Sequence, residues 1–138
     1  LGGVIQLDRT SKESKQKVLE KSIQILKKGK GSLIIYPEGT RTRTGEIGEG
    51  KWGVAKLLFE SGAPILPVAL DGAFELMKNG RKIKKKRKIK INIDKFLLFT
   101  KKKKKIKNLE KDSEEYKNYL RQATDKIMQK IKQLKKEI

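Results

Sequence analysis

Apolar residues along this chain fall into strand-length runs separated by stretches with helical spacing. Residues 32–36 and 64–70 are nearly continuous apolar runs, and residues 4–7 form a third, shorter one. Such runs are typical of parallel strands that are covered on both faces. Residues 88–94 (KIKINID) instead alternate strictly between polar and apolar positions. This alternation predicts a strand with one face exposed to water.

Helical patterns lie between and after these runs. Residues 10–13 (TSKE) resemble a capping box, and the apolar positions that follow recur every three or four residues until Gly29. A second helix is predicted from residue 52 to 61, ending at Gly62, and a helical turn at residues 73–78. The order strand, helix, strand predicts an α/β fold, with a mostly parallel sheet and flanking helices.

The last part of the chain predicts one long amphipathic helix. A second capping box, DSEE, opens residues 112–138, and apolar residues then recur at steps of three and four. A single apolar stripe is expected to pack on the sheet or on polypeptide that precedes residue 1. A helix lying on a membrane surface is the alternative interpretation.

Length and composition fit one domain, which we expect to be part of a larger one. The chain has 138 residues, of which 36% are apolar and 38% charged, a low apolar share for an independent globule. It contains no cysteine and no histidine, so we expect no disulfide, no thiolate nucleophile and no metal site. No apolar run approaches the roughly 18 residues that cross a bilayer.

The net charge of +20 is unevenly distributed. Residues 81–107 carry 15 basic and one acidic side chain, a net charge of +14, whereas the remaining residues are close to balanced. Most of the cations are lysine, a point charge without the planar fork that reads nucleic-acid bases. Phe96-Leu97-Leu98-Phe99 precedes five lysines, a pattern that favours an anionic membrane surface over nucleic acid. A buried strand end followed by a solvated lysine loop is the structural alternative.

The densest chemistry lies at residues 36–43 (YPEGTRTR), directly after the apolar run at 32–36. Arg41 and Arg43 offer planar guanidinium forks that suit phosphate oxygens. Gly39 allows the backbone to turn tightly and to approach a ligand. These residue types predict an anion-binding loop at the end of a strand.

The string Pro-Glu-Gly-Thr-Arg at 37–41 resembles the signature of the glycerolipid acyltransferases, the family of 1-acyl-glycerol-3-phosphate acyltransferase. Three further segments resemble other blocks of that family in the right order: residues 3–9 (GVIQLDR), 50–57 (GKWGVAKL) and 63–69 (APILPVA). Four blocks in sequence make the resemblance specific. It covers the chain from its first residue to about residue 100.

The resemblance implies an enzyme that moves an acyl group from acyl-CoA or acyl carrier protein to lysophosphatidic acid, giving phosphatidic acid. It implies a site on the cytoplasmic face of a membrane in phospholipid synthesis, with no cofactor, no metal and no covalent acyl-enzyme. It assigns Arg41 and Arg9 to the acceptor phosphate, and Glu38 and Gly39 to shaping the pocket.

The catalytic group implied by the resemblance is absent from these residues. The family's first block is a histidine followed five positions later by an aspartate, and this chain contains no histidine. We therefore expect the block to precede Leu1, and the 138 residues alone to be inactive. No catalytic residue is assigned within the chain, and Glu38 is expected to support the site.

Further loop residues have open roles. Thr40 either binds substrate or caps the turn. Lys51 stands where a glycine-rich loop meets a predicted helix N-terminus, so it either binds the substrate anion or is an exposed lysine. Arg43 is expected to be solvated and to serve the site weakly.

Two other classes of function compete with the enzyme. Residues 45–51 (GEIGEGK) fit the start of a nucleotide-binding P-loop, but Trp52 replaces the Ser or Thr that holds magnesium, and the two glutamates would repel a triphosphate. A basic membrane- or nucleic-acid-binding module without catalysis is the second alternative.

Overall fold

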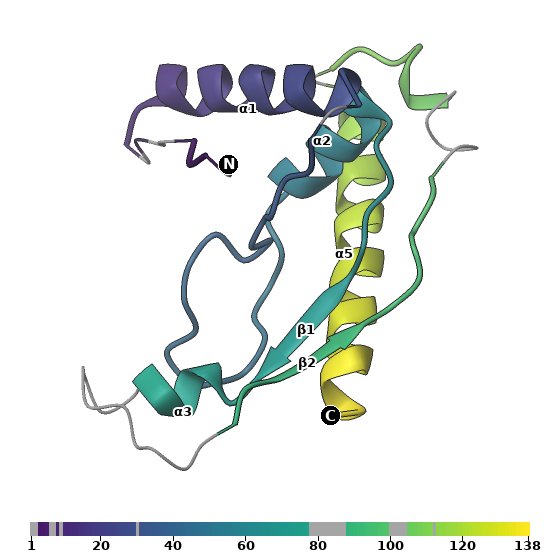
Figure 1. The fold of residues 1–138 in the computed structure, drawn as a ribbon. Helices are drawn as coiled ribbons and strands as arrows, with labels where there is room; N and C mark the ends of the chain where they lie inside the picture. Colours follow the sequence, from purple (N-terminus) through teal and green to yellow (C-terminus); the bar gives the residue numbers. More distant parts are fainter. Residues whose placement is uncertain are drawn as a thin grey trace.

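A computed structural model of the chain describes residues 3–5, 8, 10–29, 31–77, 88–99, 105–111 and 113–138. Its elements follow one another along the chain as Figure 1 shows. Their bounds are α1 (Lys12–Lys27), α2 (Gly53–Ser61), β1 (Val68–Asp71), α3 (Ala73–Met77), β2 (Lys90–Ile93) and α5 (Glu114–Lys136).

Serine hydroxyls fix the start of both long helices. The Ser11 side chain accepts a hydrogen bond from the backbone N–H of Ser14, and Ser113 does the same for Tyr116. These bonds satisfy N–H groups that have no partner within the helix. The capping-box motif suggested a start one residue earlier, at Thr10, but Thr10 instead donates its hydroxyl to the Asp8 carboxylate at 2.7 Å.

The described strands form one antiparallel pair. Val68 of β1 lies opposite Ile93 of β2, and an isolated bridge between Ile65 and Leu97 extends the pairing. The strands predicted at residues 64–70 and 88–94 are therefore present in shorter form. Among the described residues there is no parallel pair, so the mostly parallel sheet expected from the sequence is not shown.

Residues 32–36 belong to no helix or strand, although their apolar run predicts a buried strand. Ile34 is 89% exposed. A strand needs a neighbouring strand to pair with its backbone N–H and C=O groups. Among the described residues no strand pairs with these five residues.

The two faces of the β1–β2 pair differ. One face packs on α5: Ala69 is buried there, and the Asn92 amide donates a hydrogen bond to the carbonyl of Leu134 at 3.2 Å. On the other face Ile91 and Ile93 are 61% and 58% exposed. The alternating pattern predicted one exposed face, and in the described part of the chain this face is apolar.

The core lies between α2, α5 and the segment that leads into α5. The apolar stripe of α5 is buried there, which confirms that this helix packs on the rest of the chain. Phe59 of α2 contacts Phe99 edge to face, with ring centroids 6.2 Å apart. The cluster consists of Ala55, Leu58, Phe59, Ile106, Tyr116, Leu120 and Ala123.

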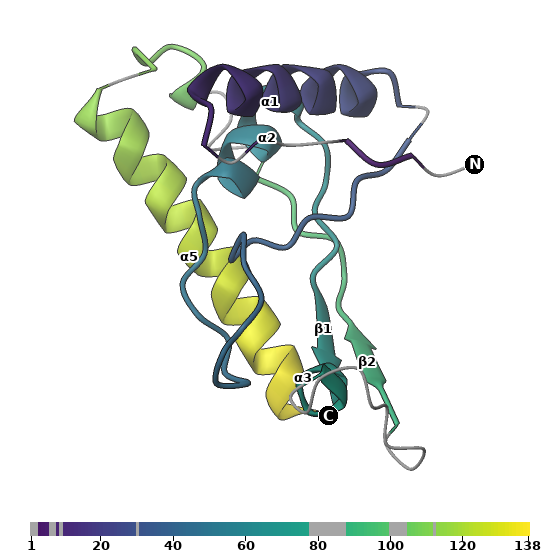
Figure 2. The same ribbon diagram turned by 90° about the vertical axis from the view of Figure 1, so that its left-hand side faces the viewer.

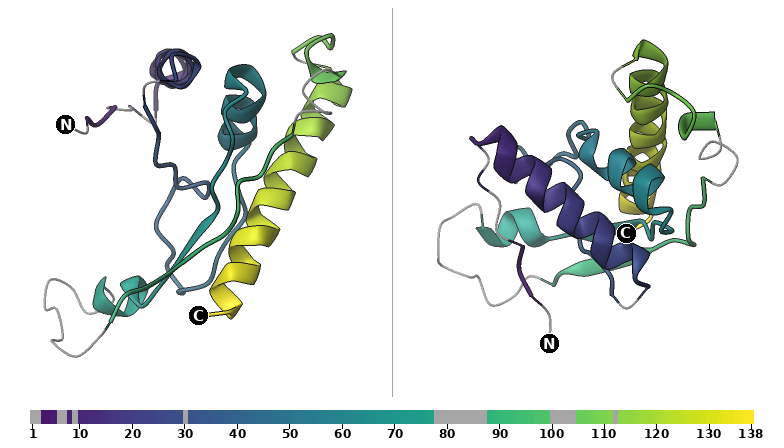
Figure 3. Two further views of the ribbon diagram at one scale, coloured as in Figure 1. Left: turned by 45° about the vertical axis from the view of Figure 1, so that its right-hand side comes forward. Right: turned by 90° about the horizontal axis from the view of Figure 1, so that it is seen from above.

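The helices are arranged so that α5 runs along both α2 and the β1–β2 pair, as the view in Figure 2 shows. Helix α1 packs on α2, at the end of the molecule away from the strand pair (Figure 3). Residues 81–87 and 100–104, which hold ten of the 15 basic side chains of segment 81–107, lie outside the described residues. None of the described helices has the length and apolar character needed to cross a membrane.

Replacing Phe59 by alanine is expected to lower the free energy of unfolding by about 3 kcal/mol, because it empties a ring-sized volume in the core. Phe96 is the matched control: it is 62% exposed, whereas Phe59 is 5% exposed. Phe96→Ala should change the free energy of unfolding by less than about 0.5 kcal/mol. Urea unfolding followed by circular dichroism measures both, and equal losses would contradict this position of the core.

Candidate functional site

We call residues 36–52 the motif loop. It contains the predicted anion-binding segment and returns to the start of α2. Two backbone hydrogen bonds close the loop at its base. The N–H of Gly39 donates to the carbonyl of Tyr36 at 2.9 Å, which makes a tight turn, and the N–H of Lys51 donates to the carbonyl of Pro37 at 2.8 Å. The two ends of the loop are thereby held side by side.

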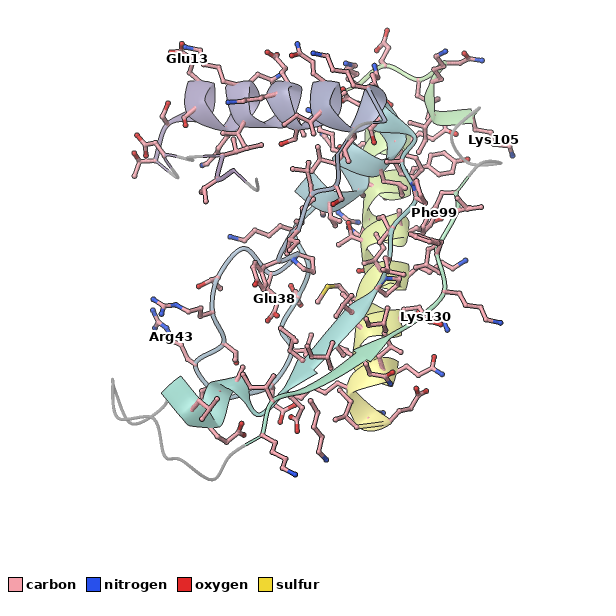
Figure 4. All side chains as sticks on the ribbon, in the orientation of Figure 1. Glu13, Glu38, Arg43, Phe99, Lys105 and Lys130 are labelled. Carbon is pink, nitrogen blue, oxygen red and sulfur yellow. The ribbon has the colours of Figure 1, made fainter. Side chains whose placement is uncertain are left out.

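Glu38 joins the two halves of the motif loop. Its Oε2 atom accepts a hydrogen bond from the N–H of Gly48 at 2.8 Å, and the side chain is half-buried. Figure 4 shows Glu38 inside the loop. Because a carboxylate is a strong acceptor for backbone N–H groups, this bond fixes the spacing between the halves. The carboxylate thus has a partner within the loop, and it forms no ion pair with an arginine of the described residues.

Gly39 is required by both its backbone and its neighbour. Its φ is +66°, a left-handed conformation that side chains disfavour. The Lys51 side chain also lies over it, because a Cβ at Gly39 would stand 3.1 Å from Lys51 Cδ and 3.2 Å from Nζ. The structure thus places the Lys51 side chain against the backbone turn that follows Glu38.

The other predicted ligands lie on the outer side of this turn. Thr40, Arg41 and Arg43 are exposed, and Figure 4 shows Arg43 directed away from the body of the molecule. Within the described part of the chain the Arg41 guanidinium has no hydrogen-bond or ion-pair partner. Its hydrogen-bond donors are therefore free for a ligand.

The remaining predicted ligand, Arg9, lies outside the described residues. Its neighbour Asp8 accepts hydrogen bonds from the hydroxyl and the backbone N–H of Thr10. The bond from the Thr10 hydroxyl is the larger cause that lowers the pKa of Asp8 below its ordinary value. Asp8 is therefore an ionised turn former in this structure.

Contacts from α5 to the motif loop were not found by sequence reasoning. The Arg121 guanidinium lies 5.6 Å from the centre of the Trp52 ring, and the Lys135 ammonium donates to the carbonyl of Gly45 at 2.9 Å. In each pair the two residues are more than 60 positions apart in the sequence, so no local pattern indicated the contact. The helix was interpreted only by its apolar stripe.

The glycines that suggested a P-loop have other roles. Gly48 donates to Glu38, Gly45 meets the ring of Phe74, and Gly50 lies against α5. No strand of the described residues runs into this segment, and Lys51 lies over Gly39. The described residues also contain no cluster of three or more metal-binding side chains. The geometry therefore gives no support to a nucleotide site.

The motif loop lies within the segment that known proteins share. Residues 1–71, about half of the chain, match the family model described as Acyltransferase. The chain belongs to the acyltransferase family. This acyltransferase segment includes the motif loop, α1, α2 and all of β1, but not β2 or α5.

Relatives of this acyltransferase carry one kind of name. The chain is 33% identical over 78 residues to the chloroplastic 1-acyl-sn-glycerol-3-phosphate acyltransferase BAT2 of Brassica napus, covering 56% of this chain and 22% of the relative. It is 40% identical over 68 residues to the 1-acyl-sn-glycerol-3-phosphate acyltransferase of Borreliella burgdorferi, covering 49% of this chain and 27% of the relative. A probable enzyme of the same name from Mycoplasma pneumoniae is 32% identical over 79 residues, covering 57% and 29%.

The matched part of the chain thus spans between a fifth and a third of the length of these curated relatives. No solved structure matches the chain.

Replacing Glu38 by alanine is expected to free the Gly48 N–H and to speed its hydrogen exchange about tenfold, since a hydrogen bond to a charged acceptor is lost. Glu38→Gln retains an acceptor oxygen and should give a smaller change. Exchange measured by NMR at the Gly48 amide provides the test. An unchanged rate in Glu38→Ala would show that this carboxylate does not hold the motif loop.

Proposed function

We propose that this chain is part of an enzyme that transfers a fatty acyl group from acyl-CoA or acyl carrier protein to the free hydroxyl of 1-acyl-glycerol-3-phosphate. The product is phosphatidic acid, and the process is phospholipid synthesis. Membership of the acyltransferase family and the names of the relatives support this reaction class. The motif loop supports the choice of a phosphorylated acceptor.

The observation that carries the proposal is that Glu38 and Arg41 have different partners within the motif loop: Glu38 binds the backbone, and Arg41 faces solvent. Glu38 Oε2 accepts the hydrogen bond from Gly48, and within the described part of the chain no carboxylate forms an ion pair with Arg41. The donors of the exposed Arg41 guanidinium are therefore available to a phosphate group.

Other residues are proposed to complete the acceptor site. Lys51 adds a second positive charge beside the backbone turn at Gly39, where its side chain already lies. Thr40 has only a long hydrogen bond of 3.5 Å to the carbonyl of Arg41, so its hydroxyl is available to the substrate. Arg9 is proposed for the same acceptor phosphate from its place in the sequence.

The acyl transfer itself needs a general base, which we propose to lie outside these 138 residues. In the proposed reaction the acceptor hydroxyl oxygen attacks the thioester carbonyl, a base takes the hydroxyl proton, and the thiolate leaves and is protonated. The chain has no histidine. We propose that a histidine outside this chain is the base, that Glu38 only supports the loop, and that no metal, cofactor or covalent acyl-enzyme takes part.

The proposal extends to the setting of the enzyme. We propose that residues 32–36 join a mostly parallel sheet when a neighbouring strand is available, and that the enzyme works on the cytoplasmic face of a membrane. The exposed side chains of Phe96 and Leu98 adjoin the lysine-rich residues 101–105 in the sequence, which suits an anionic bilayer surface. No nucleic-acid partner is proposed.

Replacing Arg41 by alanine is expected to weaken binding of glycerol 3-phosphate at least tenfold, because a charge-assisted hydrogen-bond pair is lost. Arg43→Ala is the matched control, since it removes the same charge two residues away and should weaken binding much less. Isothermal titration of the purified chain measures both. Equal losses would mean that the loop attracts anions only through its net charge.

The chain alone is expected to give no acyl transfer above the uncatalysed rate, because it lacks the general base. Release of free coenzyme A from an acyl-CoA in the presence of lysophosphatidic acid measures the reaction. Activity of the isolated 138 residues, lost again in Arg41→Ala, would contradict the assignment of the base to another segment.

A further inference from the structure

Helix α5 fastens the second half of the motif loop at two points, although α5 lies outside the residues that match the family. The first point is Gly45, which meets α5 near its C-terminal end. Lys135 Nζ donates to the carbonyl of Gly45 at 2.9 Å and lies 3.9 Å from the Asp71 carboxylate. The Phe74 ring also adjoins Gly45, since a Cβ there would be 2.8 Å from the ring.

The second point is Gly50, where the loop returns to α2. A Cβ at Gly50 would stand 2.7 Å from both Met128 Cγ and Thr124 Cγ2, and these two α5 side chains are buried. Only a glycine lets the backbone come this close to the helix. The end of the motif loop therefore lies directly against α5.

The two points are spaced so that the chain between them follows the helix. From Thr124 to Lys135 α5 rises by about 16 Å, at about 1.5 Å per residue. The five steps from Gly45 to Gly50 span about the same length when the backbone is extended, at about 3.3 Å each. Figure 2 shows the loop returning along the C-terminal half of α5.

The fastened half determines the position of the other half. Gly48 lies between the two points and donates to Glu38, while Lys51 beyond the second point donates to Pro37. The turn that carries Thr40 and Arg41 is thus attached to a segment that α5 holds in place. A shift of Gly45 would move Gly48, and through Glu38 the turn.

We propose that Lys135 is a positioning residue for the phosphate-binding turn, acting through its hydrogen bond to the Gly45 carbonyl. This inference rests on the proposed function for the identity of the anion. It assigns α5 a part in the site as well as in the core. In this proposal Lys135 acts on the turn and not on the ligand, so most of its effect on binding passes through Arg41.

The test compares Lys135→Met with Lys136→Met. The neighbouring Lys136 is exposed and carries the same charge, so the pair separates the hydrogen bond from the loss of a cation. Lys135→Met should speed exchange of the Gly48 amide and weaken glycerol 3-phosphate binding about fivefold, while Lys136→Met leaves both near the wild-type values. Lys135→Arg, which keeps a donor, should restore most of the affinity. The melting temperatures of the variants should differ by no more than the loss of one surface charge would cause.

A double-mutant cycle completes the experiment. In an Arg41→Ala background, Lys135→Met should have a much smaller effect on glycerol 3-phosphate affinity, because most of its influence runs through that arginine. An undiminished loss without Arg41, or equal effects of the two lysine variants, would overturn the positioning role. If the unaltered chain does not bind glycerol 3-phosphate, the proposed acceptor is wrong. In that case the Gly48 exchange rate still decides whether Lys135 holds the loop.

Discussion

The hydrogen bond from the Gly48 N–H to the Glu38 carboxylate is the interaction on which the candidate site depends. It links the halves of a glycine-rich loop that has little regular structure of its own. It gives the Glu38 carboxylate a partner within the loop, and the described residues show no ion pair between Glu38 and Arg41. One contact thus gives the loop a defined shape, while the Arg41 guanidinium has no protein partner among the described residues.

The loop could not keep this shape without the helices behind it. Its base is closed at Pro37 and Lys51, next to the start of α2, and its far half lies on α5. These helices share a core in which Phe59 and Tyr116 are buried. Packing of the core therefore affects the position of the motif loop. The long helix α5, which looks purely structural, takes part in positioning the turn.

Several features followed from the sequence because they depend on neighbouring residues. The capping boxes placed the starts of the two long helices within one residue of the Ser11 and Ser113 caps, and Gly62, in a left-handed conformation, ends α2. Apolar spacing identified the buried stripe of α5. The Glu-Gly-Thr-Arg string indicated the family, which the match over residues 1–71 shows. Capping and helical periodicity act within a few residues, so they can be recognised before the fold is known.

Only the tertiary structure decided which distant parts of the chain pair with one another. Nothing near Glu38 indicated Gly48 as its partner, and nothing near Gly45 indicated Lys135, ninety positions away. The apolar run at residues 32–36 predicted a strand, yet it pairs with no strand among the described residues. The sequence by itself determined the helices, the motif and the distribution of charge. The contacts that shape the loop depend on which elements pack together, because hydrogen bonds between distant segments form only where packing brings those segments within reach.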